Sequence, residues 1–226
     1  MRASALDAVL FDLDGTLIDT APDMIAALNG LRAQEGLDAL PYSIARTQVS
    51  HGSSGLVSLA FPAAGSADFE LLRERFLGLY NERLAVETRL FEGCEQVLGA
   101  LEAANKPWGI VTNKPAFLTA PLLAALMLDR RAGCVISGDT LPQRKPHPAP
   151  LLHAATLLGV AADRCLYIGD AQRDIQSARA AGMPVLLAGY GYLGPTDDPA
   201  SWAADGQIAS PLELLSWLGL AAPLAV

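Results

Sequence analysis

The sequence has few cysteines, few aromatic residues and no long apolar run. The three cysteines, Cys94, Cys134 and Cys165, are odd in number and far apart, and their spacing matches no metal-binding motif. They predict no disulfide framework and favour a reducing cytoplasm. No apolar stretch reaches the length of a membrane span. Residues 1–5 lead directly into an expected strand without the apolar segment of a signal peptide, so we expect a cytoplasmic protein without a membrane partner.

Positive charge is scarce as well. The 226 residues carry 16 Lys and Arg against 24 Asp and Glu, and no run of basic residues occurs. A nucleic-acid-binding protein would normally show a basic patch, so we expect no nucleic-acid partner. The net charge of −8 also opposes long-range attraction of a small anion. A phosphate site must therefore be built locally, from a metal, a lysine and backbone N–H groups.

Short apolar runs alternate with helical patterns along most of the chain, whose 51% hydrophobic residues suffice for a folded core. The expected strands are residues 6–11, 108–112, 134–137, 165–168 and 184–187, with a weak one at 207–209. The expected helices are residues 95–104, 148–158, 171–181 and 211–218. This alternation predicts an α/β fold with a Rossmann-like parallel sheet covered on both faces. In such sheets, ligands bind beyond the carboxyl ends of the strands.

The region from about Thr20 to Arg89 breaks this rhythm, because it contains no convincing strand. Residues 22–32 show a helical pattern, and apolar residues recur at helical spacing from Phe69 to Leu84. About 70 residues is long for a single crossover connection. We therefore expect a small all-α domain at 20–89, inserted after the first strand into a core made of 1–19 and 90–226. The alternative is that these helices belong to the core, with further strands between them.

The residues from Asp12 to Thr16 directly follow the first expected strand and read Asp-Leu-Asp-Gly-Thr. A turn at Gly15 can bring Asp14 beside Asp12. Two acids that close repel each other unless a cation or a proton lies between them. An N-cap followed by a turn is the structural alternative, since the same residue types favour both. The complete pattern is rarer than either and favours a divalent metal site with a catalytic pair.

Three further polar segments follow expected strands or lie beside them. Thr112 and Asn113 end the second strand and can offer a hydroxyl and backbone N–H groups to phosphate oxygens, although they also suit a helix cap. Lys145 precedes a proline and can supply a compact positive charge, or it can be a solvated surface lysine. Asp170 and Asp174 lie at i and i+4, on one side of a first helical turn, where they suit metal binding or capping.

Taken in order, the D-x-D-G-T, T-N, K-P and G-D-x-x-x-D motifs resemble those of the haloacid dehalogenase superfamily, and the resemblance covers nearly the whole chain. The helical insertion looks like the C1-type cap of that family. Within the superfamily, the chain is similar to the phosphoglycolate phosphatase group. Residues 111–115 and the tail around Gly189, Tyr192 and Trp202 are also similar to bacterial N-acetylmuramic acid 6-phosphate phosphatases.

The resemblance implies a role for each acid of the motifs. Asp12 would be the nucleophile. Asp14 would be the general acid and base, and would give its backbone carbonyl to Mg2+. Asp170 would be a ligand of Mg2+, and Asp174 would support the metal or its waters. The metal set implied by the resemblance is therefore Asp12, Asp14, Asp170 and Asp174. The dehalogenases of the family lack the second acid of the first motif, so Asp14 favours phosphoryl transfer.

The remaining roles implied by the resemblance concern phosphate and substrate. Thr112, Asn113 and Lys145 would bind the phosphoryl group, and Lys145 would also neutralise charge on the nucleophile. The cap residues His51, Gly52, Ser53 and Ser54 lie where related phosphatases carry their specificity loop, although a turn between cap helices is the alternative. The resemblance thus implies a Mg2+-dependent phosphomonoester hydrolase acting through an aspartyl-phosphate. Its substrate would be 2-phosphoglycolate or a sugar phosphate such as N-acetylmuramate 6-phosphate, and it would be a monomer or homodimer.

Three other functions remain to be weighed against this one. A phosphomutase similar to β-phosphoglucomutase would keep every core residue and differ in protecting the aspartyl-phosphate from water. A non-catalytic phosphate-binding protein would be marked by loss of Asp12, Asp14 or Lys145, and none is lost. The Gly189 to Gly194 segment matches the G-x-G-x-x-G pattern of dinucleotide-binding oxidoreductases. That function is disfavoured because Pro195 and a polar loop follow instead of a helix.

Overall fold

The computed structural model describes residues 6–221, and its centre is a six-stranded sheet with the order β5-β4-β1-β6-β7-β8. Every strand is parallel to its neighbours. The strands are β1 (Ala8–Phe11), β4 (Trp108–Val111), β5 (Cys134–Ile136), β6 (Cys165–Gly169), β7 (Val185–Ala188) and β8 (Gly206–Ile208). The α/β fold class and all six strands expected from the sequence are therefore confirmed.

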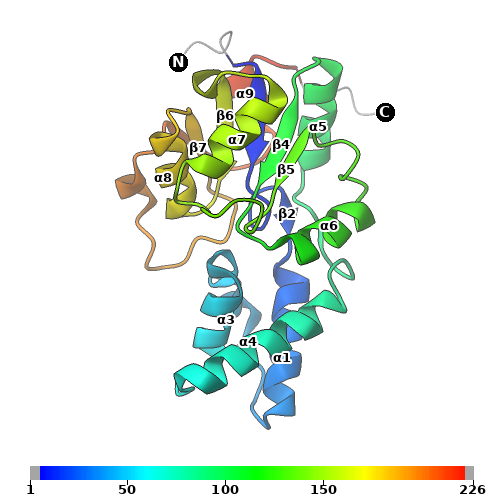
Figure 1. Cartoon of the computed structure of the whole chain (residues 1–226), viewed down its shortest axis with the longest axis vertical. Helices are drawn as coiled ribbons and strands as arrows, with labels where there is room; N and C mark the ends of the chain where they lie inside the picture. Colours follow the sequence, from blue (N-terminus) through cyan, green and yellow to red (C-terminus); the bar gives the residue numbers. More distant parts are fainter. Residues whose placement is uncertain (1–5, 222–226) are drawn as a thin grey trace.

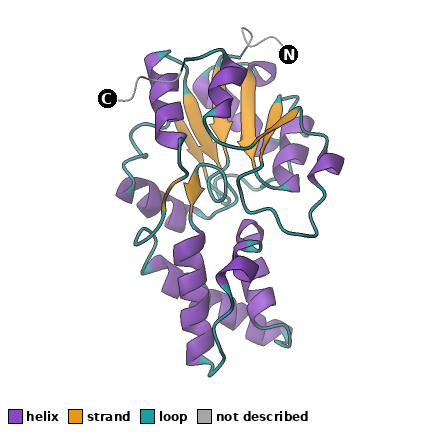
Figure 2. Cartoon of the chain, turned by 180° about the vertical axis from the view of Figure 1, so that it is seen from behind, coloured by secondary structure: helices purple, strands orange, loops and turns teal. Residues whose placement is uncertain are grey.

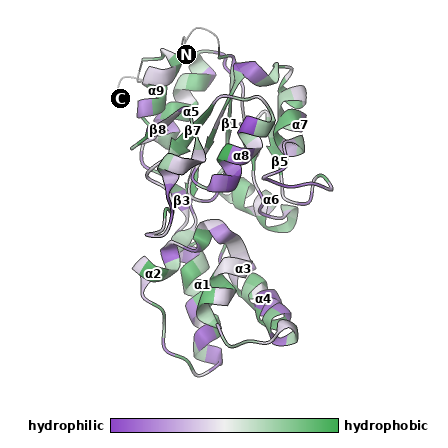
Figure 3. Ribbon diagram, turned by 90° about the vertical axis from the view of Figure 1, so that its left-hand side faces the viewer, coloured by the Kyte–Doolittle hydropathy of each residue, from purple (hydrophilic) through white to green (hydrophobic). Residues whose placement is uncertain are grey.

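The two faces of the sheet are covered by different helices, as Figure 1 shows. Val9 and Phe11 of β1 belong to one apolar cluster, and Ala8 and Leu10 belong to the other, because successive side chains of a strand point to opposite faces. On the sheet face of the first cluster lie α5 (Cys94–Ala103), α6 (Ala116–Ala125) and α9 (Glu213–Leu218). Those of the second are α7 (Ala149–Leu158) and α8 (Gln172–Ala180). Figure 3 shows the apolar colour of the strands enclosed between these layers.

Four helices form a separate lobe next to the sheet, and Figure 2 shows that this lobe contains helices and loops but no strand of the large sheet. They are α1 (Ala21–Gln34), α2 (Tyr42–Arg46), α3 (Gly52–Ala60), preceded by η2 (Val49–His51), and α4 (Ser66–Asn81). The sequence analysis predicted α1 and α4 but did not resolve α2 and α3. Leu84, which we expected to continue the pattern of α4, lies beyond the end of that helix. No helix within residues 6–221 combines the length and apolar character of a membrane span.

A two-stranded antiparallel sheet joins the lobe to the rest of the chain. It pairs β2 (Ile18–Asp19) with β3 (Arg89–Leu90), in the register Asp19 with Arg89. The sequence analysis missed both strands, because two residues are too few to show a periodicity. The pair brings the two chain crossings between sheet and lobe side by side.

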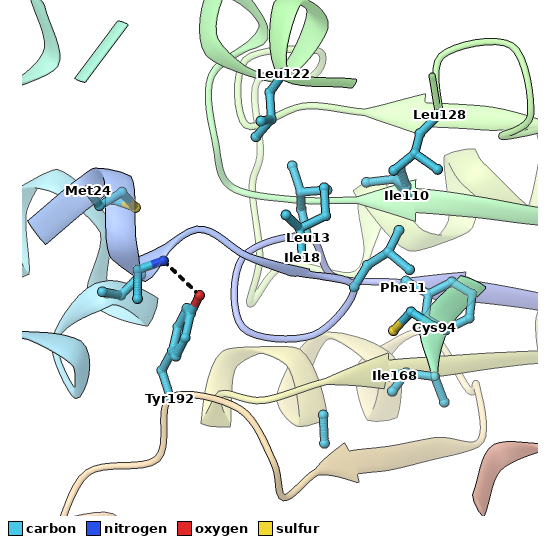
Figure 4. Close-up of a cluster of buried hydrophobic side chains, with 14 of the residues drawn as sticks. Phe11, Leu13, Ile18, Met24, Cys94, Ile110, Leu122, Leu128, Ile168 and Tyr192 are labelled. Carbon is cyan, nitrogen blue, oxygen red and sulfur yellow. Dashed lines mark hydrogen bonds between the residues drawn. The ribbon is translucent and has the colours of Figure 1, made fainter. Parts of the chain in front are cut away.

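The apolar core continues from the large sheet towards the lobe. Figure 4 shows Phe11, Ile110 and Ile168, from three neighbouring strands, with Met24 of α1 at the far side of the same cluster. Tyr192, from the loop after β7, lies between them. Its hydroxyl oxygen accepts hydrogen bonds from the backbone N–H groups at the start of α1, so this loop holds the first helix of the lobe against the sheet.

Candidate active site

The strand register brings the predicted polar residues to one edge of the sheet. Phe11 of β1 is paired with Ile110 of β4 on one side and with Ile168 of β6 on the other. Asp12 follows one residue after this row, and Thr112 and Asp170 follow two residues after it. The three residues therefore lie together at the carboxyl edge of the sheet. This is the edge at which open parallel sheets bind their ligands.

Lys145 lies at the centre of this group, although its backbone comes from the loop between β5 and α7. Its side chain is 1% exposed. The Nζ atom lies 2.7 Å from Oδ1 of Asp12 and 2.8 Å from Oδ1 of Asp174. It also donates to the carbonyl oxygen of Val111 at 2.9 Å and to the hydroxyl oxygen of Tyr167 at 2.8 Å. A buried ammonium requires such compensation, so Lys145 is not the solvated surface lysine of the alternative interpretation.

Asn113 fixes the backbone that carries Lys145. Its side-chain amide donates to the carbonyl oxygen of Lys145 at 2.9 Å, and its Oδ1 accepts from the N–H of Lys145 at 3.0 Å. Both polar ends of the side chain are thus engaged with the backbone of Lys145. The hydroxyl of Thr112 accepts from the N–H of Lys114 at 3.1 Å and can still donate its own proton.

Asp12, Asp170 and Asp174 form a buried group of acids whose ligand oxygens all lie within 4.8 Å of one another. Oδ2 of Asp170 accepts from the N–H of Tyr192 at 2.9 Å, and Oδ2 of Asp174 accepts from the N–H of Ala171 at 3.0 Å. These bonds fix the two carboxylates. Oδ1 of Asp170 has only the hydroxyl of Thr16 at 3.5 Å, whereas Oδ1 of Asp174 also contacts Lys145 and Tyr167. Carboxylate oxygens in a fixed group are the donors that Mg2+ prefers, so the residues present fit a divalent cation of that type.

The electrostatics of the group point the same way. Burial raises the pKa of Asp12 to about 7, against the lowering effect of Lys145 and with the help of Asp174 and Asp170. Burial and the neighbouring Asp174 raise the pKa of Asp170 to about 6. Acids that bind protons this readily have too little positive charge around them. Lys145 and Arg173 both lie near, but two cations do not balance three carboxylates.

Asp14 lies apart from these three acids in its contacts. Its Oδ1 accepts from the hydroxyl of Thr20 at 2.6 Å and from Nζ of Lys114 at 3.0 Å. Its side chain is 17% exposed, more than that of Asp12. The turn that follows Asp14 needs Gly15, which has a φ of +86° and lies so close to Asp170 that a Cβ would be 2.2 Å from Oδ2 of that residue.

A cavity of about 590 Å3 opens above these residues, between the sheet edge and the helical lobe. Asp12, Asp14, Thr112, Asn113 and Lys145 line it from the side of the sheet. The lobe lines it with Val49 and the predicted segment His51, Gly52, Ser53 and Ser54. The structure therefore places the four predicted lobe residues opposite the acids of the sheet edge.

Two residues outside the predicted site set also contact this site. The hydroxyl of Ser50 donates to Oδ2 of Asp170 at 2.7 Å, and the guanidinium of Arg173 donates to the carbonyl oxygen of Ser50. Arg173 lies inside the predicted Asp170 to Asp174 motif and could have been considered as a cation. Ser50 begins the lobe segment that the resemblance singles out, but its contact with Asp170 joins residues 120 apart in the sequence, which no local pattern specifies.

Comparisons with known proteins agree with this arrangement. The family model described as haloacid dehalogenase-like hydrolase matches residues 9–188. A phosphoglycolate phosphatase of Xanthomonas campestris pv. campestris is 47% identical over 207 residues, which cover 92% of this chain and 94% of that protein. An N-acetylmuramic acid 6-phosphate phosphatase of Pseudomonas aeruginosa is 42% identical over 219 residues, covering 96% of this chain and 97% of that protein.

The solved structures show the same similarity. A crystal structure from Haemophilus somnus, described as that of a predicted phosphoglycolate phosphatase, has a TM-score of 0.84 at 28% identity. It covers 96% of this chain and 98% of the other. The similarity thus extends over the sheet and the helical lobe together.

Proposed function

The chain belongs to the haloacid dehalogenase-like hydrolase family, and on that basis we propose that it is a phosphatase that hydrolyses a small phosphomonoester. The observation that carries the proposal is the contact of Lys145 with Asp12 and Asp174 at the floor of the cavity. A carboxylate that attacks a phosphate monoester meets an anion, and a fixed ammonium beside both reduces that repulsion.

In this proposal Asp12 is the nucleophile. One oxygen of its carboxylate is held by the N–H of Leu13 at 2.8 Å and by Lys145, which fixes the orientation of the group. Attack by Asp12 on phosphorus forms an aspartyl-phosphate as the ester oxygen leaves. The hydroxyl of Thr112 and the backbone N–H of Asn113 would bind the phosphoryl oxygens, as donors that need no movement.

Asp14 is proposed as the general acid and base. It lines the same cavity as Asp12, two residues earlier in the chain. Its proton would pass to the leaving oxygen as the P–O bond breaks, and its carboxylate would then take a proton from the water that hydrolyses the aspartyl-phosphate. One residue can serve both steps because the first leaves it ionised.

We propose that Asp12, Asp170, Asp174 and the backbone carbonyl of Asp14 hold a Mg2+ ion. Support comes from the donor chemistry of the three buried carboxylates and from the raised pKa values of Asp12 and Asp170, which burial causes. When bound, the ion supplies positive charge that offsets the repulsion between the carboxylates and the phosphate.

Two substrate classes follow from the names of the relatives, 2-phosphoglycolate and N-acetylmuramate 6-phosphate. A cavity of about 590 Å3 has room for an amino-sugar as well as for a small acid. We propose that residues 20–89 act as a cap that encloses the leaving group, with His51, Gly52, Ser53 and Ser54 contacting it. The three buried free thiols fit a reducing cytoplasm, and a monomer or homodimer would suffice, since one chain lines the cavity.

A Mg2+-dependent phosphate-release screen tests this function. It should include 2-phosphoglycolate, N-acetylmuramate 6-phosphate and simple hexose phosphates, each with and without EDTA. We expect release from at least one of them and its loss in EDTA. Isomer formation without phosphate release would indicate a mutase instead, and no reaction with any phosphomonoester would overturn the proposal.

A further inference from the structure

Lys114 is a buried lysine for which the motifs give no role. It follows Thr112 and Asn113, and its side chain is 4% exposed. Its Nζ donates to Oδ1 of Asp14 at 3.0 Å and to the hydroxyl oxygen of Tyr80 at 2.8 Å. A buried ammonium is costly without such partners, so this position of Lys114 depends on Asp14 and Tyr80.

Tyr80 brings the helical lobe into this contact. It lies near the end of α4, is fully buried, and its ring stacks on Phe76 of the same helix at a centroid distance of 6.2 Å. Lys114, in contrast, belongs to the loop after β4. The hydrogen bond between them therefore joins the lobe to the sheet edge, and it exists only while α4 lies against that edge.

Asp14 is held on one side only. Its Oδ1 accepts two hydrogen bonds, from the hydroxyl of Thr20 at 2.6 Å and from Lys114. Within residues 6–221, no donor reaches its Oδ2. Oδ2 is therefore the oxygen left to give or take a proton, and Asp14 lines the cavity.

We propose that Lys114 and Tyr80 are positioning residues that orient Asp14 for proton transfer when the lobe lies over the site. The inference rests on the proposed function, in which Asp14 gives its Oδ2 proton to the leaving oxygen as the P–O bond breaks. Lys114 fixes the other oxygen of Asp14, and Tyr80 fixes Lys114. The acid is therefore aligned only in the arrangement that also encloses the leaving group.

The first test compares two leaving groups in the Lys114→Met variant. An alkoxide must be protonated as it leaves, whereas p-nitrophenolate departs without help. We expect kcat to fall about 100-fold for whichever of 2-phosphoglycolate and N-acetylmuramate 6-phosphate the wild-type protein hydrolyses. The rate of the first p-nitrophenolate burst from p-nitrophenyl phosphate should fall less than about fivefold. Tyr80→Phe should show the same selectivity with a smaller loss, since Lys114 remains.

A double-mutant cycle shows whether Lys114 acts through Asp14. In the Asp14→Asn background, Lys114→Met should cause no further loss of the alkyl-ester rate, because the group that Lys114 positions is already absent. Direct contact of Lys114 with the substrate would instead multiply the two losses. Lys106→Met is the matched control: Lys106 binds the backbone carbonyl oxygen of Leu6, outside the cavity, and its removal should leave both rates unchanged.

Equal losses for the two esters, or multiplicative losses in the cycle, would overturn the positioning role while leaving the phosphatase function in place. Wild-type kinetics in Lys114→Met would overturn it as well. Failure of the wild-type protein to release phosphate from any phosphomonoester would instead remove the proposed function on which the role rests. Circular dichroism and thermal unfolding of each variant identify any loss of folded protein.

Discussion

At the scale of single residues, Asp12 is the side chain on which the proposed chemistry depends most directly. Asp12→Asn keeps the shape of the side chain and removes the attacking carboxylate. We expect phosphate release to fall at least about 1,000-fold, since loss of a nucleophile removes the covalent route. The fold should persist, because the amide can still accept from the N–H of Leu13 and from Lys145. Steady-state assays with circular dichroism check both statements, and near-wild-type turnover would exclude Asp12 as nucleophile.

The raised pKa values of Asp12 and Asp170 predict how pH and metal act together. Burial raises these pKa values to about 7 and about 6, above about 3.9 for an unfolded aspartate. Between these values the folded state binds more protons than the unfolded state. The contribution of the two acids to the free energy of unfolding is therefore full below about pH 4 and is lost as the pH rises towards 7.

A divalent cation competes with those protons for the same carboxylates. We therefore expect Mg2+ to raise the unfolding midpoint more at about pH 7.5 than at about pH 5.5. At a concentration 100 times its dissociation constant, the ion would increase the free energy of unfolding by about 2.7 kcal/mol. Thermal unfolding in EDTA and in MgCl2 at both pH values measures the difference. Asp170→Asn should lose most of the Mg2+ effect, and an equal shift in that variant would place the ion elsewhere.

Three of the residues predicted from the sequence share one property. Asp12, Thr112 and Asp170 each follow a strand that is visible in the sequence, so the sheet itself brings them together. Lys114 and Tyr80 were missed because their contact depends on how α4 packs against the sheet edge, which no local pattern specifies. The two hydrogen bonds that engage the side chain of Asn113 with Lys145 were missed for the same reason.

At the scale of elements, the strands of the sheet were predictable because their buried positions are filled by consecutive apolar residues. The pair β2 and β3 was not, since each has only two residues. The G-x-G-x-x-G match at Gly189 to Gly194 forms part of a loop without a helix, and the loop instead contacts Asp170 and the start of α1 through Tyr192. This position makes the loop a structural bridge between sheet and lobe.

Tyr192→Phe tests that bridge. The hydroxyl of Tyr192 accepts from the N–H groups of Thr20 and Ala21 and donates to Asp19 at 2.7 Å. Its removal leaves the buried N–H of Thr20 without a partner, and the N–H of Ala21 keeps only its 3.3 Å bond to Asp19, so we expect a loss of about 1–3 kcal/mol of unfolding free energy. Urea unfolding measures the loss at an unchanged slope. Tyr42→Phe, at a position that is 45% exposed, is the control and should change stability by less than about 0.5 kcal/mol; equal losses would argue against the bridge.

At the scale of the whole molecule, the lobe lies in contact with the site. Ser50 of the lobe donates to Asp170, and Arg46 of α2 donates to the carbonyl oxygen of Gly191 at 3.0 Å. The link between Tyr80 and Lys114 and the bonds of Tyr192 with the start of α1 also hold the lobe over the sheet edge. An enclosed leaving group must then fit the space that remains, so the size of the cavity limits which esters react.

Ser53→Trp tests that limit. Ser53 is a half-buried residue of the cavity wall on the lobe, so a large side chain there narrows the cavity and replaces none of the acids. We expect kcat/KM for N-acetylmuramate 6-phosphate to fall at least about tenfold more than kcat/KM for 2-phosphoglycolate, because the bulkier leaving group loses its space. Ser66→Trp, at an exposed position at the start of α4, is the control. Equal changes for both esters would show that the leaving group does not occupy the space beside Ser53.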